Sequence, residues 1–153
     1  MGPDKNNKKK TGASSKVVRV EATDLDDRGA GVARLPRPDD GRGKRPPIAL
    51  HVQGLLPGER ADVQIEHRSP HGPQAFGRLA RRYNAAPDRV VPSCSAYGRC
   101  GGCALQHLAY PAQLRWKAER LQGALRAAGL EVDVAGCVPS ENEGYGVRGR
   151  AKL

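Results

Sequence analysis

Short stretches in which apolar and polar residues alternate follow one another between residues 16 and 83, and they limit the possible folds more than any other feature. In the first stretch, Val18, Val20 and Ala22 alternate with polar residues, as in a strand that buries one face. Four further stretches, separated by turn-forming residues, lie at 31–35, 48–52, 61–66 and 75–80. The sequence therefore predicts a mainly β fold with a small OB-like barrel, an architecture whose strands and loops bind oligonucleotides.

One helix is predicted after the barrel, over roughly residues 111–128. Its apolar residues recur at alternating steps of four and three and form one stripe, which we expect to be a core face. The stripe consists of Leu114, Ala118, Leu121, Leu125 and Ala128. Pro111 suits the first turn of this helix, and Gly129 suits the position just past its end. Trp116 lies off the stripe and is expected to pack against the barrel or the loop before the helix.

These patterns divide the chain into four parts. Residues 1–15 are rich in Lys, Asn, Ser and Gly without apolar periodicity, so we expect a disordered basic tail. The barrel is assigned to 16–83, and a linker with a cysteine-bearing loop to 84–110. Residues 111–153 hold the helix and the start of an α+β domain, in which 131–135 alternate weakly like a strand.

Three of the four cysteines lie within ten residues, at Cys94, Cys100 and Cys103. Gly101 and Gly102 between them allow a short loop to fold back, because glycine takes positive φ values readily. Thiolates this close together usually hold a metal ion or an iron–sulfur cluster. Their spacing differs from that of paired zinc hooks and lies nearer the plant-type cluster pattern. A fourth ligand would be the remaining cysteine, at position 137, or a residue outside this chain.

Two other roles for the cysteines remain open, namely a disulfide framework and unrelated buried thiols. Met1 is followed by polar and basic residues and not by an apolar leader, so the secretory setting that disulfides favour is not indicated. No stretch approaches the ~18 apolar residues of a membrane span. We therefore expect a soluble, cytoplasmic protein that does not enter a membrane. We also expect it to be a monomer.

The chain is strongly basic, with 26 Lys and Arg against 16 Asp and Glu, a net charge of +10. The tail through Lys16 carries +4 of this charge, which leaves +6 elsewhere. A basic excess of this kind indicates a polyanionic partner, most often nucleic acid. Only 4% of the residues are aromatic, so we expect Phe76 and Tyr83 to add little by base stacking and binding to be mainly electrostatic. The basic residues expected to contact phosphates are Arg34, Arg78, Arg81 and Arg82.

The cysteine motif, Cys94-x₅-Cys100-Gly-Gly-Cys103-x₂-Gln106-His107, is preceded by Asp-Arg-Val-Val-Pro at 88–92. It resembles the N-terminal half of the S-adenosylmethionine-dependent RNA uracil-5-methyltransferases that carry a TRAM domain and an iron–sulfur cluster. The TRAM-like part runs from 17 to about 82, with its most telling residues at 29–33 and 55–60. The stretch at 148–153 resembles a Tyr-Arg-Asn-Lys/Arg-Ala segment of the family, with valine and glycine in place of its tyrosine and asparagine.

This resemblance implies a [4Fe–4S] cluster with Cys94, Cys100 and Cys103 as ligands and a fourth cysteine beyond residue 153. It implies that Cys137 is an ordinary cysteine and that His107 is a structural hydrogen-bonding residue. The partner would be RNA, and ribosomal RNA is favoured. S-adenosylmethionine and the catalytic cysteine and glutamate belong to a C-terminal domain that no segment here resembles. We therefore expect an N-terminal segment that transfers no methyl group by itself.

A second class of function stays open, a free-standing nucleic-acid-binding OB module with a zinc-stapled loop. A reading frame that continued into another cysteine and a glycine-rich cofactor loop would favour the methyltransferase. An electron-transfer ferredoxin is disfavoured by the charge of +10 and by the long barrel.

Overall fold

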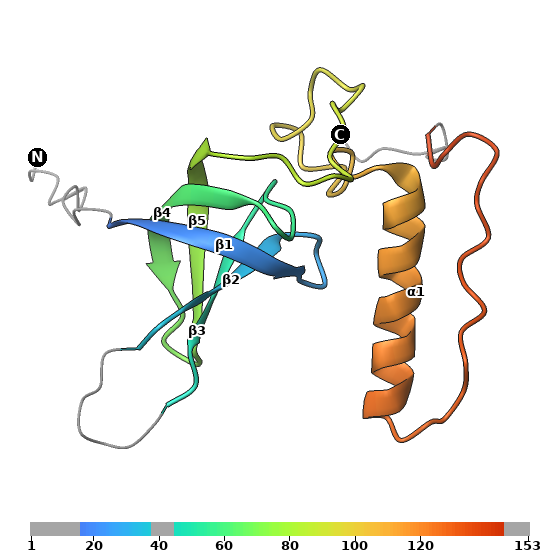
Figure 1. Ribbon diagram of the computed structural model, residues 1–153, viewed down its shortest axis with the longest axis horizontal. Coiled ribbons are helices and arrows are strands. Elements are labelled where there is room, and N and C mark those ends of the chain that lie inside the picture. The colour runs from blue at the N-terminus through green and yellow to red at the C-terminus, as the bar shows by residue number, and fades with distance from the viewer. Residues whose placement is uncertain (1–15, 38–44, 146–153) are drawn as a thin grey trace, which may run out of the picture.

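The computed structural model describes residues 16–37 and 45–145. These residues form a five-stranded barrel and one helix, joined by a long loop (Figure 1). The elements are β1 (Val17–Leu25), β2 (Gly31–Leu35), β3 (Ile48–Val52), β4 (Arg60–Arg68), β5 (Gln74–Arg82) and α1 (Tyr110–Ala127). The predicted tail over 1–15 and the family-like stretch over 148–153 lie outside the described residues.

The strands close into a barrel in the order β1-β2-β3-β5-β4, and β4 returns to β1. Neighbouring strands are antiparallel except for β3 and β5, which are parallel. This arrangement confirms the predicted mainly β fold, with a small OB-like barrel followed by one helix. The last two strands extend further than predicted, to Arg68 and Arg82.

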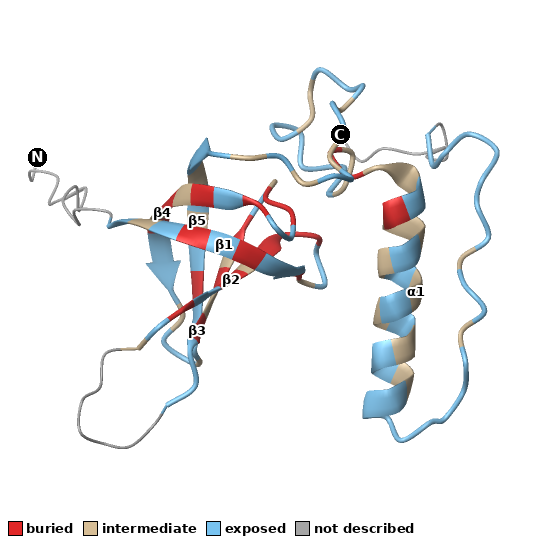
Figure 2. Ribbon diagram, in the orientation of Figure 1, coloured by how far each residue is buried: buried red, intermediate tan, exposed pale blue. Residues whose placement is uncertain are grey.

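The barrel core consists of the inward-facing half of each alternating strand (Figure 2). Leu50, Val52 and Val63 are fully buried there, and burying a side chain of this size stabilises a fold by about 1.5–3 kcal/mol. Gly77 occupies an inward position on β5, where a Cβ atom would lie 2.5 Å from a methyl carbon of Val63. A larger residue at this position would therefore collide with the core.

Helix α1 begins and ends within one residue of the prediction. Pro111 lies in its first turn, and Gly129, with φ of 75°, ends it. The N–H of Leu130 donates to the carbonyl of Leu125, and that of Gly129 donates to the carbonyl of Arg126, as in a Schellman motif. Within the described ranges no helix has both the length and the apolar character needed to cross a membrane.

The apolar stripe of α1 is not the core face that we expected. Ala112 is the buried residue of this helix, and the half-buried Trp116 packs beside it against a cluster that includes Leu25 and Leu108. Leu121, in the middle of the stripe, is 53% exposed. The reason is that the early turns of α1 contact the barrel, whereas the rest of the helix extends past it (Figure 1).

The predicted strand over 131–135 is also wrong, because this segment is extended without a partner strand in the described part of the chain. It runs back along α1 on the side away from the barrel (Figure 1). The amide of Gln122 holds it there, donating to the carbonyl of Val132 and accepting from the N–H of Val134, each at 2.8 Å.

Candidate functional site: the cysteine loop and the barrel surface

The three clustered cysteines lie on one surface loop between β5 and α1. Cys94, Cys100 and Cys103 are all exposed. Two consecutive turns shape the loop, since the N–H of Tyr97 donates to the carbonyl of Cys94 and the N–H of Cys100 to that of Ala96, each at 3.0 Å. Gly101 has the positive φ that we predicted, at 71°, whereas Gly102 does not.

All four cysteines are free thiols, so the disulfide framework does not form in this structure. Three free, exposed thiols on one loop have the chemistry that an iron–sulfur cluster requires of its ligands. However, no three His, Cys, Asp or Glu side chains among the described residues are arranged so that they could hold a metal ion. The loop thus carries the three cysteines close together in sequence, without arranging them as a metal site. The cluster stays a prediction.

The half-buried Tyr97 and the buried His107 tie the first turn of the loop to the segment that follows it. The Tyr97 hydroxyl donates to the carbonyl of Ala104 at 2.7 Å and is also hydrogen-bonded to Nδ1 of His107. Because the hydroxyl has one proton to donate, Nδ1 of His107 is the donor in the second bond. His107 is 1% exposed, and burial, together with the nearby charge of Arg89, lowers its pKa to about 4. It is a neutral hydrogen-bonding residue, as expected.

A buried pair fixes the linker that carries this loop to the end of the barrel. Glu59, in the turn before β4, is fully buried, and its carboxylate accepts hydrogen bonds from Nε and Nη2 of Arg89. The N–H groups of Leu56 and Ala86 donate to it at 2.9 and 3.0 Å. Burial alone would raise the pKa of Glu59, but the hydrogen bonds from Arg89 and these N–H groups lower it below its ordinary value. No local sequence pattern indicates this pairing, because the two residues are thirty positions apart.

The far end of the loop packs against the turn between β1 and β2. Gly29 in this turn has φ of 79°, and a Cβ atom there would lie 2.7 Å from Cδ2 of Leu105. Leu108, three residues on, joins the small core between the barrel and α1. The cysteine loop is therefore anchored at its base on both sides, whereas its cysteines face solvent.

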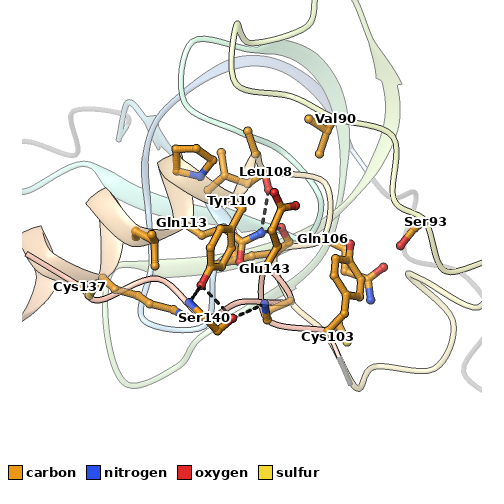
Figure 3. Close-up of a pocket in the computed structure, with 18 of the residues that line it drawn as sticks. Val90, Ser93, Cys103, Gln106, Leu108, Tyr110, Gln113, Cys137, Ser140 and Glu143 are labelled. Carbon is orange, nitrogen blue, oxygen red and sulfur yellow. Dashed lines mark hydrogen bonds between the residues drawn. The ribbon is translucent and has the colours of Figure 1, made fainter. Parts of the chain in front are cut away.

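Cys137 lines the same hollow as Cys103, between the loop, the start of α1 and the returning segment (Figure 3). The two cysteines lie at opposite ends of this hollow (Figure 3). Between them, the hydroxyl of Tyr110 accepts a hydrogen bond from the N–H of Ser140 at 2.7 Å. This arrangement does not join Cys137 to the other three thiols, and we keep the prediction that it is an ordinary cysteine.

The four arginines predicted to contact phosphates do not share one surface. Arg34 on β2 and Arg78 on β5 are exposed on the barrel wall. The guanidinium of Arg81 lies over the ring of Tyr83, 5.0 Å from its centre. Arg82 is turned toward the barrel end, where its Nε lies 3.8 Å from the carboxylate of Glu59. Arg34, Arg78 and Arg81 are thus exposed on the barrel wall, and of these Arg81 is engaged with the ring of Tyr83.

Sequence reasoning named Phe76 but missed the two histidines that meet it on the outer surface of the barrel. Phe76 stacks with His51 on one neighbouring strand and with His67 on the other. Histidines at such positions carry no pattern of their own, and their meeting depends on strand order and register, which the sequence does not display.

Comparison with known proteins points to the same class of enzyme as the cysteine motif does. Over 141 residues, 92% of this chain, it is 41% identical to the 23S rRNA (uracil(1939)-C(5))-methyltransferase RlmD of Edwardsiella ictaluri. It is 37% identical over 148 residues to the same-named protein of Vibrio campbellii, and 40% identical over 114 residues to an uncharacterized RNA methyltransferase of Halalkalibacterium halodurans. No family model matches the chain.

The similarity covers 92%, 95% and 74% of this chain, but 29%, 31% and 22% of the respective relatives. The chain thus spans less than a third of the length of these curated proteins. Over most of its own length it is similar to RNA methyltransferases, among them enzymes named for uracil-5 methylation of 23S rRNA.

Proposed function

We propose that this chain is the RNA-binding and iron–sulfur segment, on the N-terminal side, of an RNA uracil-5-methyltransferase that acts on ribosomal RNA. The observation that carries the proposal is the 41% identity over 92% of the chain to a 23S rRNA uracil-5-methyltransferase. The OB-like barrel and the loop with three free thiols support it. Binding of S-adenosylmethionine and methyl transfer are assigned to a C-terminal domain outside this chain.

In this proposal Cys94, Cys100 and Cys103 hold a [4Fe–4S] cluster, and a cysteine outside this chain supplies the fourth thiolate. Such a cluster would cross-link the loop to another part of the protein, a structural role. The anchored base of the loop supports this assignment, because Tyr97 and His107 already tie its first turn to the segment that follows it. The barrel supplies the basic surface, and Arg34 and Arg78 are its outward-facing phosphate contacts.

The cluster is tested by elemental analysis of protein purified without oxygen. We expect iron and sulfide with visible absorbance, at partial occupancy because one ligand lies outside this chain. Cys100→Ser and Cys103→Ser should abolish the colour, since each removes a ligand. Cys137→Ser is the matched control and should retain most of it. Stoichiometric zinc without iron would instead support a nucleic-acid-binding module with a zinc-stapled loop.

A further inference from the structure

Three rings stand in a row on the outer surface of the barrel, one on each of three adjacent strands. His51 on β3 lies opposite Phe76 on β5, and Phe76 lies opposite His67 on β4. The ring centres of His51 and Phe76 are 5.1 Å apart, with 22° between the planes, and those of His67 and Phe76 are 6.2 Å apart, with 24°. We call these three residues the aromatic row. Phe76, its middle member, is 42% exposed.

A β-bulge in β4 places His67 in the row. Ala61, Val63 and Ile65 all face the core, so strict alternation would turn residue 67 inward as well. The register shifts between Ile65 and His67, so that Glu66 is an extra residue and His67 becomes the partner of Phe76. Bulges redirect side chains in this way, and the exposed imidazole of His67 therefore lies beside Phe76 on the outer surface.

His51, at the other end of the row, is held in place by the turn between β1 and β2. Its Nδ1 lies 2.7 Å from Oδ2 of Asp26, and Oδ1 of the same carboxylate accepts from the N–H groups of Arg28 and Ala30 at 2.8 and 2.9 Å. The ring is therefore fixed before any partner arrives, which lowers the entropic cost of binding through the row.

The surroundings of the row are polar, with arginines as well as carboxylates. Arg78 follows Phe76 by two residues on the same side of β5, and its guanidinium is exposed next to Glu66, at 3.3 Å. Arg34 faces outward on β2, next to β3. A protein-docking surface would be expected to surround its aromatic centre with further apolar groups, whereas flat rings beside exposed guanidinium groups suit a polyanion that carries flat bases.

We propose that the aromatic row is a stacking platform for unpaired bases of single-stranded RNA. A base continues the row on the open side of His67 or packs along the exposed part of Phe76, while Arg78 and Arg34 bind neighbouring phosphates. This rests on the proposed RNA-binding function of the barrel. It replaces the expectation that stacking contributes little, because Phe76 acts as part of a fixed set of three rings. Stacking tolerates any base, so sequence preference stays weak.

The test measures binding of the whole chain to a fluorescent single-stranded oligouridine by anisotropy. Phe76→Leu should weaken binding by about five- to thirty-fold, because it removes the ring but keeps an apolar side chain. Phe76→Trp should retain the affinity of the unchanged protein. The loss in Phe76→Leu should disappear on an abasic oligomer with the same number of phosphates, and the salt dependence should stay the same. His67→Ala should show a smaller loss of the same kind.

Tyr83→Leu is the matched control. Tyr83 is similarly exposed, at 40%, but the guanidinium groups of Arg19 and Arg81 lie over its ring, 4.4 and 5.0 Å from the centre. A ring covered in this way is not open to a base, so its replacement should cost much less than that of Phe76. Thermal unfolding of each variant verifies that the barrel remains folded.

Three results would overturn the proposal, and they are distinguishable. Unchanged affinity of Phe76→Leu and His67→Ala for oligouridine would exclude the platform but leave RNA binding by the barrel intact. Absence of RNA binding by the unchanged chain at low salt would exclude both. A dimer of the unchanged chain in sedimentation experiments, dissociated by Phe76→Leu, would identify the row as a contact between two copies.

Discussion

At the scale of single residues, His107 shows how burial determines a protonation state. Its Nδ1 is satisfied by Tyr97, whereas Nε2 is buried without a hydrogen-bond partner in the described residues. A proton on Nε2 would place a charge in a site with no group to receive it and with Arg89 nearby. The folded protein therefore keeps this imidazole neutral, and the pKa falls to about 4.

This pKa makes stability depend on pH. The folded pKa lies below the ordinary value of 6.5, so between these values the unfolded chain binds the proton and the folded chain does not. Stability from this group is complete above pH 6.5 and declines as the pH falls toward 4. We expect a loss of about 2 kcal/mol between pH 7 and pH 5, measured by urea unfolding.

Substituting the histidine isolates its share of this effect. His107→Gln can still donate to Tyr97 but does not titrate, so its free energy of unfolding should vary less over this interval. His71→Gln, on an exposed residue, should behave like the unchanged protein. Equal pH dependence in all three proteins would show that His107 is not the group responsible.

At the scale of elements, the Glu59–Arg89 pair connects the barrel to the linker. Arg89 also donates to the carbonyl of Gly54 at 2.6 Å, so one guanidinium joins both sides of the turn between β3 and β4 to the segment after β5. Removal of Arg89 takes away the closest charge partner of the buried Glu59 and leaves the more distant Arg82, at 3.8 Å, which is costly. The Glu59–Arg89 pair therefore fixes the place on the barrel from which the linker leads into the cysteine loop.

We expect Arg89→Met to lower the free energy of unfolding by about 3–5 kcal/mol. Arg115→Met provides the control, because Arg115 pairs with Asp88 at 2.7 Å on the surface, with both side chains more than half exposed. Exposed pairs contribute at most about 1 kcal/mol, so this change should be nearly neutral. Urea unfolding measures both variants, and similar losses would contradict the role assigned to the buried pair.

Sequence patterns predicted the elements better than their contacts. The period of two located all five strands because each buries one face, and Pro111 and Gly129 marked the ends of α1. The prediction that the apolar stripe of α1 is a core face was wrong. The periodicity of apolar residues identifies one face of a helix, but it does not identify the part of the protein that covers this face. The aromatic row was missed for a related reason, since the bulge before His67 reverses the side that alternation predicts.

The candidate site was predictable where it is local in sequence. Cys94, Cys100 and Cys103 occupy one loop, as their spacing indicated, and the structural role of His107 is confirmed by its bond to Tyr97. Contacts between residues that are far apart in the sequence could not be predicted in this way. They depend on where the linker crosses the end of the barrel, and this crossing is set by the closure of the whole sheet.

At the scale of the whole molecule, the charge of +10 should dominate the response to salt. If the barrel binds RNA as proposed, the logarithm of the binding constant should fall with the logarithm of the salt concentration, by about 0.7 for each phosphate neutralised. Arg78→Gln should lower this slope by about 0.7. Anisotropy titrations at several salt concentrations measure the slope.

Arg126→Gln, in the last turn of α1, removes the same charge from a helix end away from the barrel wall and should leave the slope unchanged. Equal changes in the two variants would mean that total charge, and not a defined surface, controls binding. An affinity independent of salt would contradict the electrostatic account altogether.

Closure of the barrel also has a consequence for how its wall meets a partner. Each of the five strands has a neighbour on both sides over part of its length, so many peptide groups along the wall are already engaged with one another. Closure of this kind disfavours the addition of a second chain as a strand, and edge-to-edge aggregation in the same way. Contact with the wall therefore passes mainly through side chains, and a change of one side chain can alter what the barrel binds without altering its backbone.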